Sequence, residues 1–356
     1  MIVLRKEILY CFSIGLSMLI LPCICFGASQ MNFETAQDKK NITKTAVSQS
    51  ESSHSSKENT KTTENTTVSQ NTYDSFKILD TSTGTVVTVP DKEFCYGAVA
   101  AEMPPSFESE ALKAQCVAAY TYFCRERENN RQNPSEDLKG ADFKADLSIG
   151  QYYISQETLK EKWGTLYETS FEKIKTAVDE VFGKVLTYEG ELIVCAYHAV
   201  SGGMTEACAD VFSADLPYLT AVASPYDCNA PSYQTTETFT AEELKDIFQS
   251  YDSEIAFSEN PKDWLTIKNR TNSGTVTEIQ VGSKVFDGQK IRTLLSLKSA
   301  NFEIKYNENK EFVFTVRGYG HGVGMSQYGA EYMAQQGAGY EEILKHYFTG
   351  VTITDF

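Results

Sequence analysis

Residues 106–127 read SFESEALKAQCVAAYTYFCRER, and this stretch gives the strongest local prediction in the chain. Apolar side chains recur in it at steps of three and four residues, the spacing that places them on one face of an α-helix. They are Leu112, Cys116, Val117, Tyr120, Phe123 and Cys124. Ser106 is a residue type that caps the first turn of a helix. We therefore expect a helix from Ser106 to about Arg127, with one face buried in a core.

Shorter strand and helix patterns surround this helix. Two apolar runs, residues 76–79 and 85–89, flank a Ser-Thr-Gly turn and predict a β-hairpin. Further helices are expected at 157–162, 171–181, 241–248, 326–335 and 340–347, strands at 184–188, 192–197, 264–269, 276–281 and 312–316, and a polar loop at 126–144. Because helices and strands are interspersed without a regular βαβ period, the pattern predicts an α+β fold. The density of strands is highest at about 231–316, which we expect to be a strand-rich subregion.

The N-terminus carries an export signature. Arg5 and Lys6 precede an uncharged apolar run from Ile8 to Phe26, and the small residues Gly27-Ala28-Ser29 follow it. This order is typical of a signal peptide, and the 19-residue run is also long enough to span a bilayer. Basic residues before the run place that end in the cytoplasm. We expect residues 1–28 to be a signal anchor or a cleaved signal peptide, with the rest of the chain anchored outside the cytoplasm or secreted.

Residues 29–72 have a different composition. They are rich in Ser, Thr, Asn, Gln and Lys and contain almost no apolar side chains, so they cannot bury enough surface to fold. We expect a disordered spacer there, followed by one folded domain over residues 73–356. Such a spacer would hold the domain away from a membrane.

The charge balance limits the choice of partner. The net charge is −16, from 48 acidic and 32 basic residues. Binding of nucleic acid needs a basic stripe that replaces phosphate counterions, and this sequence offers none. Nucleic acid is therefore excluded as a partner.

Cysteines lie on both sides of the predicted long helix as well as within it. The six that follow the N-terminal apolar run are Cys95, Cys116, Cys124, Cys195, Cys208 and Cys228, which can form disulfides or remain buried thiols. Cys116 and Cys124 should not pair with each other, because eight residues of one helix separate them by about 12 Å. Cys195-x-x-His198 with Cys208 does not have a standard zinc spacing, so a structural role is favoured and no metal is expected.

Three short segments could carry chemistry, and the first is Ala-Ala-Glu-Met-Pro-Pro-Ser-Phe at 100–107. Glu102 stands there among apolar neighbours, and a carboxyl that is partly removed from water has a raised pKa, which suits a general acid. Its place just ahead of a helix N-terminus acts in the other direction, because the helix dipole favours the anion. From this segment alone, a surface glutamate that assists the start of the helix is the favoured interpretation.

The other two segments are rich in glycine, and each contains a histidine. Residues 197–206 read YHAVSGGMTE, and residues 318–330 read GYGHGVGMSQYGA. Glycines expose backbone N–H groups and let a ligand approach the chain closely, as in binding loops. Neither segment matches a phosphate-binding loop, a dinucleotide fingerprint or the nucleophile elbow of serine hydrolases. A strand-to-loop turn with a satisfied histidine also explains the first of them.

In this order, the three segments resemble those of the stage II sporulation protein D (SpoIID) family, which includes the related amidase-enhancer proteins. The likeness runs from about Phe76 to Phe356. It also includes residues 110–115 (EALKAQ), 294–298 (LLSLK) with Phe302, and 342–350 (EILKHYFTG). So many ordered matches make the resemblance specific, whereas no single motif would.

The resemblance implies a lytic transglycosylase whose helices and strands surround a substrate groove for peptidoglycan glycan strands, preferentially those stripped of stem peptides. In such enzymes one carboxylic acid protonates the glycosidic oxygen and then takes the proton of the sugar's C6 hydroxyl, which closes a 1,6-anhydro ring. Glu102 matches the glutamate of the family's Glu-Met-Pro motif. Motif positions expected to line the groove fall on Tyr197, His198, Ser201, Gly202, His321 and Gln327. No cofactor is implied.

Two positions depart from the family pattern. The long helix usually contains Ala-Ala-Arg-Thr-Tyr, and here Tyr120 stands in place of the arginine, so a basic residue expected near the groove is missing. Some members carry a zinc-binding Cys/His cluster before a Gln-x-Tyr motif, but residues 142–151 contain neither Cys nor His. The resemblance thus implies no zinc at that place, and it leaves open whether the chain is the main sporulation protein or a divergent paralogue.

Two kinds of function fit the sequence. The first is the enzyme, acting in sporulation, where an exported septal protein helps the mother-cell membrane to engulf the forespore. Its implied partners are an amidase that removes stem peptides and a membrane protein that assembles the engulfment complex. The second is a non-catalytic module that presents glycan to a cell-wall amidase or stimulates it. The intact Glu-Met-Pro context of Glu102 favours the enzyme.

Overall fold

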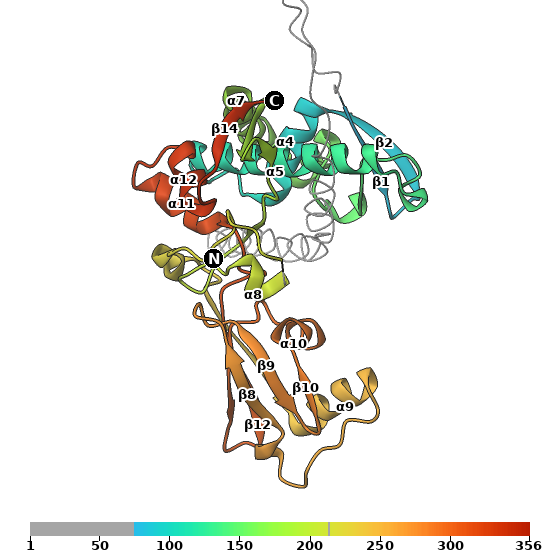
Figure 1. Ribbon diagram of the computed structural model, residues 1–356, viewed down its shortest axis with the longest axis vertical. Helices are drawn as coiled ribbons and strands as arrows, with labels where there is room; N and C mark the ends of the chain where they lie inside the picture. Colours follow the sequence, from blue (N-terminus) through green and yellow to red (C-terminus); the bar gives the residue numbers. More distant parts are fainter. Residues whose placement is uncertain (1–74, 213) are drawn as a thin grey trace, which may run out of the picture.

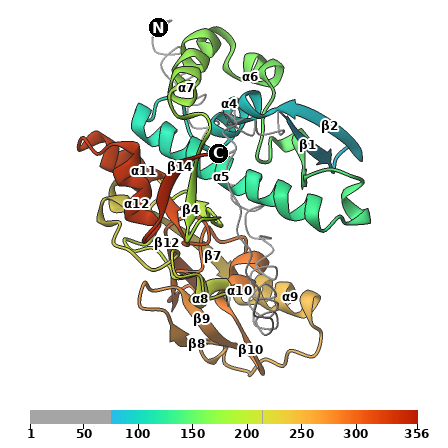
Figure 2. The same ribbon diagram turned by 45° about the horizontal axis from the view of Figure 1, so that its top comes forward.

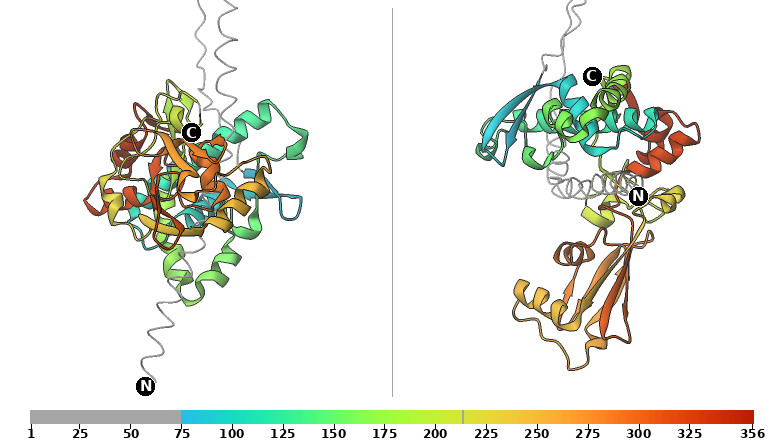
Figure 3. Two further views of the ribbon diagram at one scale, coloured as in Figure 1. Left: turned by 90° about the horizontal axis from the view of Figure 1, so that it is seen from below. Right: turned by 180° about the vertical axis from the view of Figure 1, so that it is seen from behind.

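The computed structural model describes residues 75–212 and 214–356, and its helices and strands form an α+β fold, as the sequence predicts. They make a helix-rich part and a smaller strand-rich part, which lie one below the other in Figures 1 and 3. The predictions of an anchor at 1–28 and a spacer at 29–72 lie outside the described residues. Within the described ranges, no helix is both long and apolar enough to cross a membrane.

The helix-rich part is built around α5 (Ser109–Gln132), the predicted long helix, which runs further than expected into the predicted polar loop. The helices that pack on it are α4 (Asp91–Glu102), α7 (Tyr167–Val181), α11 (Gln327–Gln335) and α12 (Tyr340–Tyr347), while α6 (Gln156–Trp163) packs on α7. Figure 1 shows α5 crossing the whole of this part. Residues 114–121 are all buried, so the prediction of one buried face was too narrow, because neighbours cover α5 on several sides.

The prediction that Ser106 caps α5 is wrong. The N-cap residue is Glu108, and no side chain of the segment caps the helix. Ser106 lies in a turn in which the Phe107 N–H donates to the Pro104 carbonyl at 3.1 Å. The Glu108 N–H donates to the carboxylate of Glu331 on α11 at 2.6 Å, so a neighbouring helix supplies the acceptor that a cap would otherwise provide.

The predicted hairpin is present and belongs to a three-stranded sheet. β1 (Ser75–Asp80) pairs antiparallel with β2 (Thr85–Pro90) and parallel with β3 (Phe143–Ala145), which lies within the predicted polar loop. An aromatic cluster fixes this sheet to α4 and α5, with every pair of its rings between 4.4 and 6.5 Å apart at the centroids. Its members are Phe76, Phe94, Phe123 and Phe143.

The strand predicted at 192–197 is divided between two sheets. β5 (Glu191–Leu192) pairs with β4 (Lys184–Tyr188), which also pairs with β14 (Thr352–Asp355) at the C-terminus. The chain then leaves this sheet, and β6 (Tyr197–His198) pairs parallel with β13 (Met325–Ser326). The continuous strand was the wrong prediction, because the partner of Tyr197 comes from a segment more than a hundred residues further along the chain.

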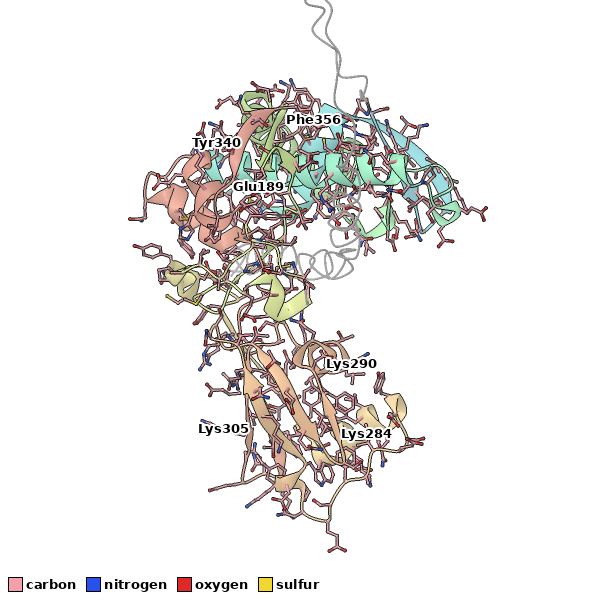
Figure 4. The ribbon with its side chains drawn as sticks, viewed as in Figure 1. Glu189, Lys284, Lys290, Lys305, Tyr340 and Phe356 are labelled. Carbon is pink, nitrogen blue, oxygen red and sulfur yellow. The ribbon has the colours of Figure 1, made fainter. Side chains whose placement is uncertain are left out.

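The strand-rich part has its own hydrophobic core, which contains Phe248, Phe302, Phe312 and Phe314. One sheet has the strand order β11-β12-β7 and the other β10-β9-β8. Their bounds are β7 (Gln234–Thr240), β8 (Leu265–Arg270), β9 (Val276–Val281), β10 (Lys284–Phe286), β11 (Phe302–Tyr306) and β12 (Glu311–Arg317). The helices α9 (Ala241–Tyr251) and α10 (Gly288–Leu294) accompany them. In Figure 4, Lys290 of α10 lies at the end nearest the helix-rich part, whereas Lys284 lies further away.

Candidate active site

Glu102 is the last residue of α4, a helix that the sequence patterns above do not predict. Pro90 before the helix, with Asp91 and Glu93 in its first turn, is a recognisable N-terminal signal. Gly97 in its interior weakens the helical pattern, but a Cβ atom at this position would lie 2.4 Å from the ring of Tyr153, so the packing requires glycine. The prediction that Glu102 lies just ahead of a helix N-terminus is therefore wrong. It stands at a C-terminus, where the dipole disfavours the anion.

The carboxyl group of Glu102 is buried and receives hydrogen bonds from neutral donors. Its side chain is 2% exposed. Gln327 Nε2 donates to Glu102 Oε2 at 3.2 Å, and the hydroxyl of Tyr197 donates a further hydrogen bond. Burial raises the pKa of Glu102 to about 7, although both hydrogen bonds favour the anion and lower the pKa. Near neutral pH this carboxyl can therefore both give and take a proton, as a general acid and base must.

Gln327 holds its place because two other elements position it. It is the first residue of α11, directly after Ser326, whose hydroxyl accepts a hydrogen bond from Gly329 N and caps the helix. Its Nε2 also lies 3.4 Å from the side-chain oxygen of Gln115 on α5, which orients the amide nitrogen toward both acceptors. Gln115 was not predicted as a site residue, although it lies in one of the stretches that resemble the SpoIID family.

The short pairing of β6 with β13 brings the two glycine-rich segments together. Met325 lies opposite Tyr197, and Ser326 lies opposite His198. Gly324 makes this approach possible, since it has a φ of +74° and a Cβ atom there would lie 2.0 Å from the Ala196 carbonyl oxygen. Successive residues of a strand point to opposite faces, so Tyr197 faces Glu102 while His198 points away.

His198 and His321 form a buried pair on that other face, with ring centroids 5.7 Å apart. His198 Nδ1 lies 3.1 Å from the Val323 carbonyl oxygen and donates to it, while His321 Nδ1 accepts from the Val323 N–H at 3.1 Å. Burial lowers the pKa of His198 to about 4. The pKa of His321 lies well below its ordinary value, mainly because the ring is buried and also because His198 is close. Both rings are therefore neutral at physiological pH, which suits hydrogen bonding better than proton donation.

A cleft of about 1100 Å³ opens between the two parts of the molecule. One wall comes from α5, β3 and the residues up to Tyr152, and the other from α8 (Cys208–Phe212), α10 and His321. Figures 1 and 2 show α10 at the end of the strand-rich part that faces α8. Five aromatic side chains line the cleft: Tyr122, Phe123, Phe143, Tyr152 and Phe212.

Tyr152 connects the cleft with Glu102. It lines the cleft, its ring packs edge-on against Phe123 at 5.3 Å between centroids, and burial followed by the charge of Glu102 raises the pKa of its hydroxyl. Its φ of +64° lies in the left-handed region that bulky residues rarely adopt, so the surrounding contacts hold it in a strained conformation. Glu102 itself is not among the residues that line the cleft, but it is close enough to Tyr152 to influence the pKa of its hydroxyl.

Ser201 and Gly202 lie away from the cleft. The Ser201 N–H donates to Asp227 at 2.7 Å, and its hydroxyl accepts from the Gly203 N–H at 3.1 Å. A Cβ atom on Gly202 would lie 2.5 Å from the amide nitrogen of Asn301. The structure thus brings Glu102, Tyr197 and Gln327 into contact and places His321 in the cleft wall, while these two residues form a turn against the strand-rich part.

Several buried polar atoms around Glu102 and the histidine pair have no hydrogen-bond partner among the described residues. They are Gln115 Nε2, Gln327 Oε1, His198 Nε2 and His321 Nε2. Buried polar groups in native proteins are nearly always hydrogen-bonded. These four atoms are exceptions to that rule, and they gather around Glu102 and the histidine pair.

No group of three or more His, Cys, Asp or Glu side chains suited to a metal ion occurs within residues 75–212 and 214–356. Cys195 and Cys208, considered with His198 as metal ligands, are buried thiols, and burial raises the pKa of each. The six cysteines of the described ranges are all free, and Cys228 alone among them is exposed.

Comparison with known proteins identifies the family. The model of the SpoIID family, described as stage II sporulation protein, matches residues 79–188. Stage II sporulation protein D of Bacillus subtilis (strain 168) is 38% identical over 282 residues, which cover 79% of this chain and 79% of that protein. The chain belongs to the SpoIID family. The resemblance predicted from the motifs is therefore confirmed.

Other relatives widen this picture of the SpoIID family. Stage II sporulation protein D of Bacillus amyloliquefaciens is 38% identical over 281 residues, or 79% of each chain. The amidase enhancer of Bacillus subtilis (strain 168) is 28% identical over 311 residues, which cover 73% of this chain but 40% of that protein. Together these SpoIID relatives support a cell-wall-related role in sporulation.

The position where SpoIID proteins usually carry an arginine lies far from Glu102. Tyr120 is buried, and its hydroxyl donates to Asp91 at the opposite end of α4, at 3.2 Å. Arg127, two turns further along α5, donates to both oxygens of Asp91 at 2.7 and 2.8 Å. The expectation that this substitution removes a basic residue from the groove is thus wrong, because Tyr120 is not among the residues that line the cleft.

Proposed function

We propose that this SpoIID protein is a lytic transglycosylase that cleaves peptidoglycan glycan strands. The observation that carries the proposal is the Glu102 carboxyl, buried beside the aromatic cleft, bonded only by neutral donors, with a pKa raised to about 7. A sugar chain in the cleft would lie against the aromatic rings, among them Tyr152, which interacts with Glu102. Because Glu102 does not line the cleft, side chains around it would have to move for the substrate to reach the carboxyl.

The proposed reaction has two proton transfers through one group. Protonated Glu102 gives its proton to the glycosidic oxygen as the bond from C1 of N-acetylmuramic acid to that oxygen breaks. The C6 hydroxyl of the same sugar then attacks C1, and its proton returns to the Glu102 carboxylate. The products are a strand that ends in 1,6-anhydromuramic acid and one with a free hydroxyl. Hydrolysis differs, because a second carboxylate is needed to activate water or attack the sugar.

The position of Gln327 and Tyr197 supports this cycle. Both donate to the carboxylate form of Glu102, which lowers the cost of the ionised state between the two transfers. Gln327 Oε1 is buried without a hydrogen-bond partner, so it would have to be uncovered before it could accept from a sugar hydroxyl or the N-acetyl N–H. His321, neutral and in the cleft wall, is suited to a similar contact.

We further propose that the enzyme works outside the cytoplasm, held by residues 8–26, on strands stripped of their stem peptides during engulfment. An amidase must act before it to produce such strands, and a membrane protein would join the two activities in one complex. The similarity to an amidase enhancer supports the link to an amidase. If the domain only binds glycan and stimulates an amidase, it should retain glycan binding without making new ends.

The test is product analysis. The exported part of the chain is incubated with denuded glycan strands, and the ends are identified by mass spectrometry. The wild type should produce 1,6-anhydromuramic ends and Glu102→Gln should not, whereas the matched buried variant Glu331→Gln on α11 should remain active. Absence of these ends with the wild type, or equal production by Glu102→Gln, would refute the proposal.

A further inference from the structure

Asp227 is a fully buried carboxyl outside the three motif segments. It lies in the short 3₁₀ helix η5 (Pro225–Asn229), and its side chain is 0% exposed. Its Oδ2 accepts two hydrogen bonds, from Ser201 N and from the hydroxyl of Ser326, both at 2.7 Å. Its Oδ1 accepts from the hydroxyl of Ser224 at 3.0 Å. Burial raises the pKa of Asp227, but all the neighbours that these contacts name can donate, which favours the ionised carboxylate.

These contacts join the two glycine-rich segments at a single carboxylate. Ser201 belongs to the first segment and Ser326 to the second. Ser326 also caps α11, where its hydroxyl accepts from Gly329 N at 3.2 Å, and the next residue is Gln327, whose amide donates to Glu102. A continuous set of bonds therefore runs from Asp227 through the start of α11 to Glu102.

The packing around Asp227 leaves little room for an alternative arrangement. A Cβ atom on Gly329 would lie 2.7 Å from Asp227 Oδ1 and 2.0 Å from the hydroxyl oxygen of Tyr347. Tyr347 in turn lies 2.7 Å from the hydroxyl of Ser224. Since the first turn of α11 is in direct contact with this network, a loss of the carboxylate should be transmitted to Gln327.

We propose that Asp227 is a positioning residue that keeps Gln327 in hydrogen-bonding contact with Glu102. The inference rests on the proposed function for its effect on turnover, but not for its effect on the geometry at Glu102. Asp227 does not touch the substrate in this account, because it acts through Ser326 and the start of α11. Neither the sequence motifs nor the family resemblance points to it.

The experiment measures Glu102 directly. The pKa of its carboxyl is followed by carbon-13 NMR of the side chain, with the signal assigned by its loss in Glu102→Gln. Asp227→Ala should raise this pKa, because a displaced Gln327 no longer stabilises the anion. The titratable groups that face Glu102 are Tyr152, whose pKa burial raises, and Tyr197, whose hydroxyl donates to the carboxyl. Those near Asp227 are Tyr332, Tyr347 and Cys228.

The second readout is the turnover of Asp227→Ala, measured alone and in combination with Gln327→Leu. Asp227→Ala should lower kcat on denuded glycan about 10- to 100-fold and move the alkaline fall of the rate to higher pH. Gln327→Leu should show the same shift. If Asp227 acts through Gln327, Asp227→Ala should add little in the Gln327→Leu background. Equal effects of Asp227→Ala in both backgrounds, or an unchanged pKa of Glu102, would overturn the inference.

Control variants separate positioning from general stability. Asp227→Asn keeps the shape and one acceptor oxygen, so it should recover most of the turnover and an almost normal pKa of Glu102. Asp142→Ala removes another buried carboxylate, which binds Arg131 at the C-terminal end of α5, and it should lower stability without moving the pKa of Glu102. If Asp227→Ala does not fold, Ser326→Ala removes the bond to Asp227 together with the cap of α11, and it should give the same upward shift.

The outcomes also distinguish this inference from the proposed function. If the wild type makes no anhydro ends but Asp227→Ala still raises the pKa of Glu102, the positioning role stands and the enzymatic proposal fails. If the wild type is active and the pKa of Glu102 is the same in Asp227→Ala, the positioning role fails alone.

Discussion

The two ends of α4 each carry a buried carboxyl, and their surroundings differ. Asp91 at the start is 4% exposed and Glu102 at the end is 2% exposed. Eleven residues of helix separate them, or about 16 Å along the axis. Arg127 donates to both oxygens of Asp91, and Tyr120 adds a third hydrogen bond. Glu102 has hydrogen bonds from Gln327 and Tyr197 and no cation within salt-bridge distance among the described residues.

The difference between these ends separates a structural carboxylate from a reactive one. Burial raises the pKa of Asp91 as well, but Asp91 lies at the helix N-terminus beside a guanidinium, where dipole and cation oppose that effect and favour the anion. Glu102 lies at the C-terminus with neutral donors only, so its proton is lost near neutral pH rather than in acid. The same helix thus presents a fixed charge at one end and an exchangeable proton at the other.

The largest expected effect comes from removing the exchangeable proton. Glu102→Gln should lower the rate of glycan cleavage about 10²- to 10⁴-fold, the usual contribution of a general acid–base group. The wild-type rate should fall above pH about 7, where Glu102 loses the proton that starts the reaction. Rates are measured by release of anhydro ends. If Asp91→Asn keeps its fold but loses as much activity as Glu102→Gln, the two carboxyls do not differ in function as we infer.

At the N-terminal end of α4, we expect replacement of Asp91 to lower the stability of the fold. Asp91→Ala leaves the Arg127 guanidinium buried without its carboxylate, which should lower the free energy of unfolding by about 3–5 kcal/mol. Urea denaturation followed by circular dichroism measures it. Replacing both Asp91 and Arg127 with apolar residues of similar size should restore most of the lost stability. If it does not, the pair has a role beyond compensating each other's charge.

Glu102 should make the protein less stable as pH rises. Its pKa is about 7 in the folded chain against the ordinary value of 4.5, so the folded state binds the proton more tightly than the unfolded state. The contribution of Glu102 to stability is therefore fully present below pH 4.5 and falls by about 3 kcal/mol between pH 4.5 and about 7. Glu102→Gln should remove this slope and be more stable than the wild type at pH 7.5. An unchanged slope in unfolding experiments would contradict the raised pKa.

The smallest expected effect is at Tyr152, which lines the cleft and interacts with Glu102. Tyr152→Ala removes an aromatic surface for the sugar and should weaken binding by roughly 1 kcal/mol, about fivefold in KM. Tyr152→Phe keeps the ring and should change KM less. The control Tyr251→Ala removes an exposed ring of the strand-rich part. If it changes KM as much as Tyr152→Ala, the cleft is not where the glycan binds.

Local patterns predicted much of the fold. The long helix follows from the repeat that includes Leu112 and Phe123, and the β1–β2 hairpin from two apolar runs around a turn. The α4 helix was not predicted, because Gly97 interrupts a short pattern and its cause, the ring of Tyr153, comes from another segment. Ser106 looked like a cap because local sequence cannot show that Glu331 supplies the acceptor.

For the site, sequence identified residues but not their geometry. Glu102, Tyr197 and Gln327 were named, and they are in contact. The reason for the raised pKa of Glu102, its burial at the end of α4, depends on how the folded chain packs around it. Gln115, Tyr152 and Asp227 were not named, because their roles arise from contacts made in the folded chain.

The most direct test of the central claim, that one carboxyl serves as both acid and base, is digestion of denuded glycan in water enriched in the heavy oxygen isotope. If the Glu102 carboxylate takes the proton of the C6 hydroxyl, that hydroxyl closes the ring. The new muramic ends should then be anhydro rings that carry no heavy oxygen and are lighter than hydrolysed ends by the mass of one water. Reducing muramic ends that carry the heavy oxygen would show that water attacked the sugar, and that result would contradict the account.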